Sequence, residues 1–383
     1  MGGEEAVTVA AKQIEGLIKA QAYGLGFDLV GIATLGPVES ADVFEHWLAE
    51  GRAGDMDYLA RGAEKRRDTR LPVDGARSAI VVGMDYGGRE PSGPVARYAR
   101  GDDYHDIMVA RLRELHRWIE REVERPVGGK AYVDTGPILE RDLARRAGLG
   151  WFGKNTMLVN PRIGSFLFLG ELLLDLELAP DEPFATDHCG TCRRCIDACP
   201  TGALAEPRVI DATTCISYLT IELRGAIPEE LRAGVGEHVY GCDVCQEVCP
   251  WNEKFALPVR EEAFRPRPAI AGKDARTLAR ELLAMSPSGF AALFGGSPMK
   301  RAKLRGLQRN SAVVLGKIGD PDDVATLAGA VSRGEPLVRR HAAWALGAIA
   351  SPEALDALGA REFVESDRLV LSAIADAIGD DGT

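Results

Sequence analysis

The stretch Cys189-Gly-Thr-Cys192-Arg-Arg-Cys195-Ile-Asp-Ala-Cys199-Pro200 decides the character of this chain. Its first three cysteines are each separated by two residues, and the fourth stands directly before proline. This spacing is typical of a 4Fe–4S cluster, because it lets three thiolates converge on three corners of one cubane. The fourth cysteine of such a run points away and ligates a neighbouring cluster. The stretch therefore predicts a pair of clusters.

A second cysteine run, Cys242-x2-Cys245-x3-Cys249-Pro250, lacks one early cysteine. Cys215, which lies 27 positions before Cys242, can take that role. The two predicted ligand sets are then interleaved, since each run lends its last cysteine to the other cluster. One cluster takes Cys189, Cys192, Cys195 and Cys249, and the other takes Cys199, Cys215, Cys242 and Cys245. All eight cysteines are used, which leaves no thiol for catalysis.

A pair of structural zinc sites is the main alternative for these cysteines, because zinc often binds paired CxxC motifs. Zinc does not explain the third cysteine at a spacing of two, or the Cys-Pro ending that occurs twice. A disulfide framework is not expected in a cytoplasmic chain of this size. The CxxxCxxC spacing of radical enzymes does not occur. Iron–sulfur clusters are therefore favoured.

The composition bounds the class of protein. A chain of 383 residues, 46% of them hydrophobic and 27% charged, is typical of a soluble globular protein of two or three domains. No apolar run reaches the length of a membrane span, and the N-terminus shows neither a secretory nor a twin-arginine signal. We therefore expect a cytoplasmic protein, with a monomer as the default. The net charge of −11 disfavours non-specific nucleic-acid binding, although a local basic patch can still act.

The pattern along the chain predicts an α+β protein of three domains. Residues 1–180 form an α+β domain, residues 181–262 a ferredoxin-like two-cluster domain, and residues 270–383 an all-α domain. Helix and strand do not alternate with a regular βαβ rhythm, so a doubly wound sheet is not expected. The expected helices span residues 9–25, Tyr104–Glu124 and Pro137–Ala147, and the expected strands span Phe27–Thr34, Ser78–Tyr86, Lys130–Asp134, Thr156–Val159 and Phe166–Leu178.

The C-terminal third contains an internal repeat. Residues 309–316, RNSAVVLG, align with residues 340–347, RHAAWALG, at an offset of 31. Each copy leads into a turn that ends in proline, at Pro321 and Pro352 respectively. A repeated helix followed by a proline turn in the same register indicates stacked helical pairs of HEAT type.

One glycine-rich stretch matches nucleotide-binding patterns only superficially. Residues 148–155, GLGWFGKN, contain GxGxxG and nearly a P-loop, but Asn155 stands where a P-loop has serine or threonine. Both patterns also need a strand before the glycines and a helix after them. A charged amphipathic helix is expected before this stretch and a strand after it, so we exclude both nucleotide sites.

Several long motifs together resemble the epoxyqueuosine reductase family. They are CGTCRRCIDACPTGAL, CISYLTIELRG, YGCDVCQEVCPWN, ARYARGDDYH and YVDTGPILERDLARRAGLGWFGKNTMLVNPRIGSFLFLGELL, joined to a HEAT-like tail. The resemblance covers nearly the whole chain. It implies a cobalamin-dependent oxidoreductase, related to reductive dehalogenases, that converts epoxyqueuosine to queuosine at the wobble position of tRNA, the last step of queuosine biosynthesis. The implied cofactors are cobalamin and two 4Fe–4S clusters. An unidentified low-potential donor supplies the electrons.

The resemblance also implies a catalytic residue. Converting an epoxide to an alkene requires two electrons, protons and the loss of water, so a general acid must protonate the departing oxygen. The family's acid is an aspartate, and the matching position is Asp134. The residues alone fit N-capping of the following helix equally well. An acid role further predicts an apolar site that closes around Asp134. His105 is expected to make ordinary hydrogen bonds at a helix start rather than to contact substrate.

The residues expected to contact cobalamin are inferred only from the positions that match the motifs of the family. The expected contacts come mainly through backbone groups between Lys154 and Leu169, with polar contacts from flanking segments; ordinary surface salt bridges explain the charged members equally well. The full expected set is Asp57, Arg97, Asp134, Arg141, Lys154, Asn155, Leu158, Ser165, Leu169 and Glu222.

A basic run opens the helical tail of this acidic chain. Five cations fall within ten residues, with no acidic residue among them: Lys300, Arg301, Lys303, Arg305 and Arg309. A charge run is usually a solvated helix face, but its position here favours contacts with tRNA phosphates. Two other functions remain open, an electron carrier that binds a partner through the repeats and a reductive dehalogenase. The first leaves the large N-terminal domain unexplained, and the second normally carries an export signal.

Overall fold

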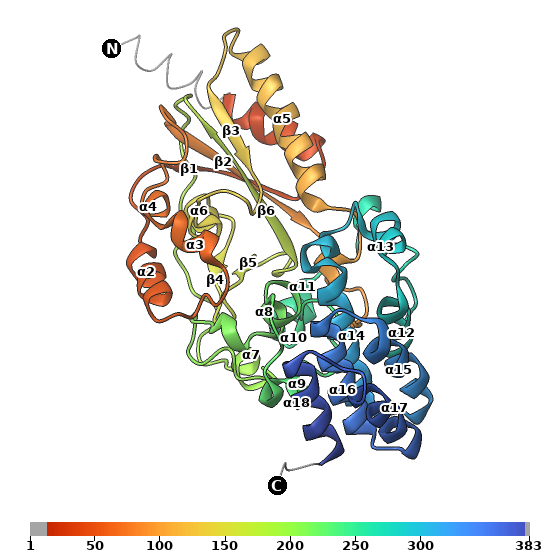
Figure 1. Cartoon of the computed structure of the whole chain (residues 1–383). Coiled ribbons are helices and arrows are strands. Elements are labelled where there is room, and N and C mark those ends of the chain that lie inside the picture. The colour runs from red at the N-terminus through yellow and green to blue at the C-terminus, as the bar shows by residue number, and fades with distance from the viewer. Residues whose placement is uncertain (1–13, 380–383) are drawn as a thin grey trace, which may run out of the picture.

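The computed structural model describes residues 14–379, and at its centre lies a four-stranded antiparallel sheet (Figure 1). The strand order is β1-β2-β6-β3. Because every neighbouring pair is antiparallel, the expectation that the sheet is not doubly wound is confirmed. The strands are β1 (Leu29–Thr34), β2 (Ser78–Asp85), β3 (Gly129–Tyr132) and β6 (Leu167–Leu174). Each overlaps a predicted strand, although β6 ends four residues earlier than expected.

Helices cover both faces of this sheet, which explains why all eight residues of β2 are buried. On one face, α5 (Tyr104–Glu122) and a helix at residues 14–24 pack against Phe168, Leu172 and Leu174 of β6. On the other face, α6 (Glu140–Arg146) packs against Leu167 and Leu173. Alternate residues of β6 thus enter two different cores. The predicted helix at 9–25 begins outside the described residues.

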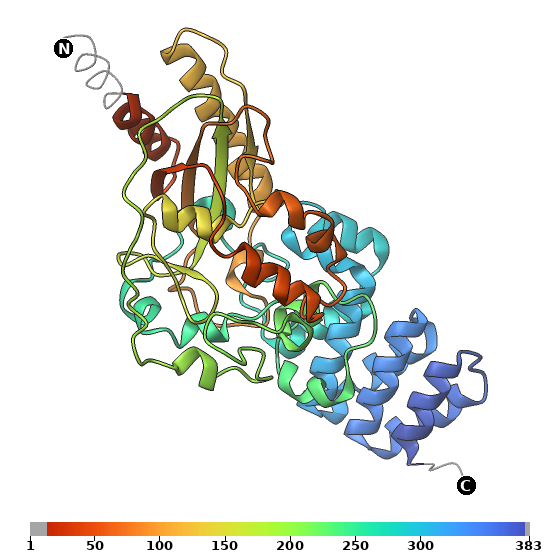
Figure 2. The same ribbon diagram turned by 90° about the vertical axis from the view of Figure 1, so that its left-hand side faces the viewer.

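The first part of the chain is completed by short elements beside α6. These are α2 (Ala41–Ala49), α3 (Asp57–Arg61), α4 (Ala63–Arg66) and a hairpin of β4 (Trp151–Phe152) with β5 (Leu158–Val159). The glycine-rich stretch therefore has a helix before it and a strand within it, which confirms that it is not built as a nucleotide-binding loop. Figure 2 shows α2 to α4 on the side of the sheet opposite α5.

The cysteine-bearing segment consists of short helices joined by loops. Its helices are α7 (Arg194–Asp197), α8 (Ile216–Ile221), α9 (Glu229–Val235), α10 (Val244–Glu247) and α11 (Pro250–Phe255), and α7 packs against α10. The helix α7 contains Cys195, the third cysteine of the first run, and α10 contains Cys245, the second cysteine of the second run. The 3₁₀ turns of the chain are η1 (Arg97–Ala99), η2 (Ala212–Thr214), η3 (Glu262–Phe264), η4 (Pro298–Ala302) and η5 (Pro321–Asp323).

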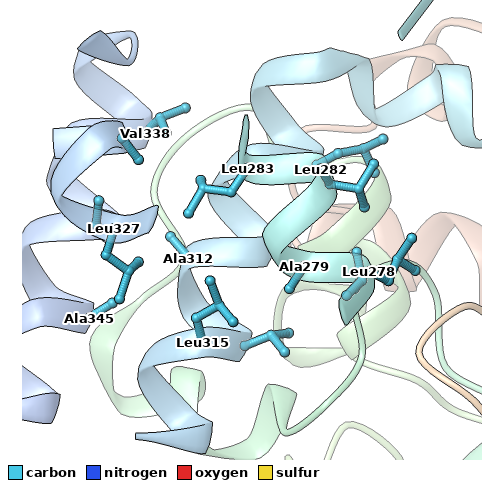
Figure 3. Packing of buried hydrophobic residues seen from close by; sticks show 14 of the residues in the cluster. Leu278, Ala279, Leu282, Leu283, Ala312, Leu315, Leu327, Val338 and Ala345 are labelled. Carbon is cyan, nitrogen blue, oxygen red and sulfur yellow. The ribbon is translucent and has the colours of Figure 1, made fainter. Parts of the chain in front are cut away.

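The C-terminal part is a helical array. It comprises α12 (Ala275–Ala284), α13 (Pro287–Phe294), α14 (Lys303–Ile318), α15 (Val324–Arg333), α16 (Pro336–Ile349), α17 (Pro352–Glu362) and α18 (Arg368–Ile378). The helix α14 packs between α12 and α16, and α16 in turn packs against α18. Figure 3 shows the shared core, in which Leu283, Ala312 and Leu315 lie between Leu282 of α12 and Leu327 of α15. The predicted repeat is confirmed, since its two copies lie in the stacked helices α14 and α16.

The array and the sheet lie at opposite ends of the molecule, with the cysteine segment beside both (Figures 1 and 2). The division at residues 180, 262 and 270 stays a prediction. Within residues 14–379, no helix combines the length and the hydrophobicity needed to cross a membrane.

The repeat places one glycine at the contact between α14 and α16 and another at the contact between α16 and α18. A Cβ atom on Gly316 would lie 2.8 Å from Ala345 Cα, and one on Gly347 would lie 2.9 Å from Ala377 Cα. We expect Gly316→Ala to destabilise the protein by about 1–3 kcal/mol, because the backbones of α14 and α16 must move apart. Thermal unfolding measures the effect. Gly359→Ala in α17 is the control, since nothing lies within 4 Å of its added Cβ; an equal loss in both variants would contradict the packing argument.

Candidate functional site

Asp134 lies just after β3 on a short loop that is held by two neighbours. Its backbone is in the left-handed region, with φ of 57°. The Tyr104 hydroxyl donates to Asp134 Oδ2 at 2.9 Å, and the Asp134 backbone N–H donates to Glu140 Oε1 at 2.6 Å. The N-cap of α6 is Leu139, which makes no side-chain cap, so the capping interpretation of Asp134 is wrong.

The Asp134 carboxyl group faces solvent, with 66% of its side chain exposed. The expectation of a closed, apolar site around it is therefore not met in this structure. Closure would have to come from substrate, cofactor or loop movement. The left-handed backbone is one that aspartate tolerates better than most residues, although it is still uncommon.

The start of α5 supplies the aromatic and polar neighbours of Asp134. The Tyr104 ring stacks on Phe168 with centroids 4.0 Å apart. Burial and the nearby Asp134 charge raise the pKa of Tyr104 well above its usual value, so this group stays a hydroxyl donor. His105 Nδ1 lies 2.7 Å from Asp103 Oδ1, and its Nε2 lies 3.9 Å from Asp134 Oδ2. The expected ordinary hydrogen bond of His105 is thus present, on the edge of the site.

A second wall of the site comes from segments distant in sequence. The Arg301 guanidinium lies 5.4 Å from the centre of the Tyr58 ring and makes two 2.8 Å hydrogen bonds to the Glu222 carboxylate. Burial, followed by the charge of Glu222, raises the pKa of Tyr58, and Asp134 adds to the effect. The helix α3, the end of α8 and η4 therefore meet close to Asp134. Asp57, at the start of α3, is exposed beside them.

Arg141, at the start of α6, lies beside Asp134 and Cys245, whose charges act on it. Its Nη1 donates to Thr156 O at 2.6 Å. Burial lowers the pKa of Arg141, with Glu140 and Asp134 opposing that effect, and the residue is still exposed to solvent. The solvent-exposed space between Asp134, Arg141 and the Tyr58–Arg301–Glu222 wall is called the opening below. Of the residues predicted to contact cobalamin, Asp57, Asp134, Arg141 and Glu222 border this opening.

Four other predicted cobalamin contacts have side chains that join the first part of the chain to the cysteine segment. Lys154 Nζ donates to Gly190 O at 2.6 Å and to Cys192 O at 2.9 Å, and Asn155 Nδ2 donates to Cys245 O at 3.2 Å. Ser165 Oγ donates to Gln246 Oε1 at 3.0 Å. Arg97 Nη1 forms ion pairs with Asp243 at 3.0 Å and with Glu247 at 2.6 Å. These side chains therefore hold two parts of the chain together, and their contact with cobalamin stays a prediction. The backbone N–H groups of Ser165 and Arg97 are also bonded, to Asn252 Oδ1 at 2.7 Å and to Asp243 Oδ2 at 2.8 Å.

The two predicted leucine contacts differ from each other. Leu158 is buried in the core beside α6, so its predicted contact concerns its backbone and stays a prediction. Leu169 is half-buried at the edge of the same core and faces the side of the sheet that carries α6.

The eight cysteines influence one another in groups that agree with the two predicted ligand sets, and the sets themselves stay a prediction. Burial, and then the neighbouring thiols of Cys189 and Cys249, raise the pKa of Cys195. Burial also raises the pKa of Cys242 to about 12, with Cys215 and Cys199 contributing. Burial, and then the thiols of Cys189 and Cys192, raise the pKa of Cys249, although those residues are far from it in sequence. These neighbours place the last cysteine of each run with the other set.

The two sets differ in their surroundings. Cys245 interacts with Arg141 and accepts a hydrogen bond from Asn155 through its carbonyl, so the set that contains it is nearer to Asp134. In the other set, Trp151 Nε1 lies 3.5 Å from Cys189 Sγ. Hydrogen bonds to sulfur are one of the features that set the potential of a cluster.

The predicted tRNA cations divide into three groups. Lys300 Nζ lies 2.7 Å from Asp103 Oδ2, and Arg301 is paired with Glu222, so both lie at the rim of the site. Lys303 and Arg305 are exposed and form no ion pair within residues 14–379. Arg309 is only 1% exposed, and its guanidinium donates to Leu219 O, Leu223 O and Gly225 O. The prediction that Arg309 contacts phosphates is therefore wrong, because α8 and the following turn cover it.

Sequence reasoning missed four residues of the site, namely Tyr58, Tyr104, Glu140 and Glu171. Tyr104 and Glu140 lie inside the quoted motifs but carry no distinctive local pattern. Glu171 could have been found, since it is the one charged residue in the apolar stretch Leu167–Leu174. A separate hollow of about 200 Å³ lies between α9, α16 and α18. Figure 1 shows these helices at the end of the molecule opposite β3.

Comparisons with known proteins agree with this arrangement. The model "Epoxyqueuosine reductase QueG, DUF1730" matches residues 66–135, a 4Fe-4S double cluster binding domain matches residues 188–252, and HEAT repeats match residues 302–379. The epoxyqueuosine reductase of Xanthomonas campestris is 43% identical over 341 residues, which cover 86% of this chain and 94% of that protein.

Solved structures share the whole architecture. An epoxyqueuosine reductase with an epoxyqueuosine-modified tRNA-Tyr stem loop is 30% identical, with a TM-score of 0.86 over 96% of this chain and 99% of that one. The enzyme from Bacillus subtilis, solved with its catalytic loop swung out of the active site, is 29% identical, with a TM-score of 0.85 over the same shares. The chain belongs to the epoxyqueuosine reductase family.

Proposed function

We propose that this protein reduces epoxyqueuosine to queuosine in tRNA, with cobalamin and two 4Fe–4S clusters as its cofactors. The observation that carries the proposal is the position of Asp134, an exposed carboxyl group on a held loop, beside an opening next to the cysteine set of Cys245. The net reaction consumes two electrons and two protons per epoxide and releases an alkene and water. A relative of the same fold was solved with an epoxyqueuosine-modified stem loop, which supports the substrate.

The residues present fit both kinds of cofactor. Eight thiols in two sets match the donors of two clusters. The opening lined by Arg141, Asp57 and Glu222 offers polar groups to the amide arms and phosphate of a cobalamin, and backbone groups between Lys154 and Leu169 border it. When bound, cobalamin supplies a low-valent cobalt that engages the substrate carbon.

The chain's own residues supply the proton and its placement. Because Asp134 Oδ2 accepts the hydrogen bond of Tyr104, the transferable proton belongs on Oδ1. Tyr104 is in turn fixed by stacking on Phe168, so the acid has a defined direction. Arg141 and the Arg301–Glu222 pair border the opening, where they can orient polar groups of the ligand.

Electrons enter, on this proposal, through the set of Cys189 and leave through the set of Cys245. The first set lies next to exposed residues such as Asp187 and Arg193, where a low-potential donor protein can approach. The second set lies beside Arg141. The tRNA substrate supports the cytoplasmic location that the sequence predicts.

The decisive experiment is turnover under anaerobic conditions. Purified protein is reconstituted with iron, sulfide and cobalamin, and then given a stem loop that carries epoxyqueuosine together with a low-potential reductant. The expected product is queuosine, identified by mass spectrometry, only when cobalamin is present. Reduction without cobalamin would contradict the proposed cofactor, and clusters without any turnover would instead favour an electron carrier.

The basic run gives a separate prediction about tRNA. We expect the double variant Lys303→Glu, Arg305→Glu to weaken stem-loop binding and to lower the slope of log affinity against log salt by about two, since two phosphate contacts are lost. These residues form no ion pair within the described chain, so structural damage is small. Arg113→Glu, Arg117→Glu on the exposed face of α5 is the matched control, and an equal change in both variants would remove the assignment.

A further inference from the structure

A buried carboxyl group lies beside the Asp134 loop, and the mechanism above does not use it. Glu171 in β6 is 0% exposed, and neither of its carboxyl oxygens receives a hydrogen bond from an N–H or O–H group within residues 14–379. An unpaired buried charge is strongly unfavourable, so such a group is normally neutral or shares a proton. The register of the sheet sets Glu171 opposite Tyr132, two residues before Asp134.

The neighbour of Glu171 is a second carboxyl group, Glu140 at the start of α6. Burial raises the pKa of both residues; the two carboxyl groups act on each other as hydrogen-bond partners, and the charge of Glu140 further raises the pKa of Glu171. Two carboxyl groups in contact cannot both ionise easily, and a single shared proton turns their contact into a hydrogen bond. That proton also gives Glu171 the partner it otherwise lacks.

The charged and titratable groups around this pair come from four elements. Asp134 adds negative charge, while Arg141 on α6 and Arg66 on α4 add positive charge, and Tyr104 on α5 faces Glu140. Arg66 also donates to Gly136 O, which lies in the loop between Asp134 and α6. Neither arginine hydrogen-bonds to the pair, so the shared proton remains the stabilising element.

Glu140 connects the pair to the acid, because its Oε1 accepts the backbone N–H of Asp134 at 2.6 Å. We infer that Glu140 and Glu171 share one proton and act as positioning residues, with Glu140 holding the Asp134 loop so that its carboxyl group faces the substrate. This inference rests on the proposed function for the role of Asp134, but the shared proton itself does not depend on that function. No covalent step is assigned to the pair.

The inference has a direct consequence for pH. When pH rises enough to remove the shared proton, two negative charges face each other under the loop, and Glu140 moves away from Glu171. The hydrogen bond to the Asp134 N–H is then lost, and the loop is released. The Bacillus subtilis relative, whose catalytic loop is swung out in one structure, supports the view that such a loop can leave its place. We therefore expect kcat to fall at alkaline pH, with KM for the stem loop much less affected.

Variants of Glu140 separate positioning from mere packing. Glu140→Ala removes the acceptor for the Asp134 N–H, and we expect kcat to fall about 10²-fold, as for other small displacements of a catalytic group. Glu140→Gln keeps an acceptor oxygen for Asp134 and offers an N–H to Glu171, so we expect it to restore kcat to within a few-fold of wild type and to leave only the alkaline fall that loss of the Asp134 proton itself causes. Equal losses in both variants would overturn the positioning role.

Glu171→Gln tests the shared proton without relying on turnover. Infrared difference spectra of wild type minus Glu171→Gln at pH 7 should show the C=O band of a neutral carboxylic acid, which disappears as pH is raised. Asp85→Asn is the matched control, since burial raises the pKa of Asp85 to about 7 but its neighbour is Asp28 rather than Asp134. This variant removes a different neutral carboxyl band and should leave the pH profile of kcat unchanged.

The outcomes distinguish this inference from the proposed function. A neutral band assigned to the pair, in a protein that fails to reduce epoxyqueuosine, would support the shared proton and contradict the function. Normal turnover with no such band, and with no change in the pH profile of Glu171→Gln, would overturn the inference and leave the function standing. Circular dichroism of each variant confirms that it is folded.

Discussion

Asp134→Asn will slow epoxide reduction by about 10²–10⁴-fold, the usual contribution of a general acid. Asparagine has nearly the same shape and can still accept the Tyr104 hydroxyl and donate its backbone N–H to Glu140, so the loop keeps its place. What it cannot do is release a proton to the departing oxygen. The effect should appear in kcat rather than in KM, and single-turnover kinetics with a prereduced enzyme measure it.

The spectra of bound cobalamin and of the clusters are the control for that variant, because they should match those of wild type. Tyr104→Phe provides a graded comparison, since it removes the hydrogen bond to Oδ2 but leaves the acid in place. We expect a smaller loss for Tyr104→Phe than for Asp134→Asn. A wild-type rate for Asp134→Asn, with cobalamin still bound, would show that another group protonates the oxygen.

The second large effect concerns Cys215, the ligand that stands apart from both cysteine runs. Cys215→Ala should lower the iron content from about eight to about four atoms per chain, because one cluster of the pair loses a ligand. Turnover should become undetectable, since the lost cluster is the one beside Arg141 and electrons can no longer reach the site. Iron analysis and low-temperature electron paramagnetic resonance of the reduced protein measure both changes.

Cys249→Ala is the informative companion of this variant. In the interleaved scheme it removes a ligand of the other cluster, so the remaining signal should differ from the one left by Cys215→Ala. If both variants left the same cluster, Cys215 and Cys249 would belong to one ligand set and the crossing scheme would fail. If Cys215→Ala kept all its iron, Cys215 would not be a ligand.

The cysteine sets were predictable because their chemistry is local. A spacing of two or three residues limits which thiols can reach one cubane, whatever the rest of the fold does. The strands were predictable for a similar reason, since short apolar runs rich in valine and leucine occupy the centre of the sheet. The repeat was visible because its two copies have the same length and the same proline turn.

The environment of Asp134 was not predictable in this way. The Glu140–Glu171 pair exists only because β3 and β6 align in one register and α6 folds back over them. Arg309 illustrates the opposite error, because its neighbours in sequence are basic and suggest an exposed face. Its burial is decided by α8, about ninety residues away, which a reading of local charge does not include.

The same reason explains why the side-chain partners of the predicted cobalamin contacts were not visible in the sequence. Lys154, Asn155 and Ser165 look like ligand contacts, because they are polar residues between glycines in a family motif. In the folded protein their side chains bond to the cysteine segment instead. A shared motif indicates that its residues have a common role in the family, but it does not distinguish contacts with a ligand from contacts with another part of the chain.

The buried guanidinium of Arg309 has a mechanical meaning for the molecule. It belongs to the array proposed to grip RNA, and it binds three carbonyls of the stretch that runs on from Cys215. Asn310 extends the same bridge to Thr220 O and Val239 O. The segment proposed to bind tRNA and the segment proposed to hold the inner cluster are thus fixed to each other through the backbone that follows Cys215. Replacing the repeats would remove these hydrogen bonds, and with them the support of the segment that carries Cys215, a predicted ligand of the cluster nearer to Asp134.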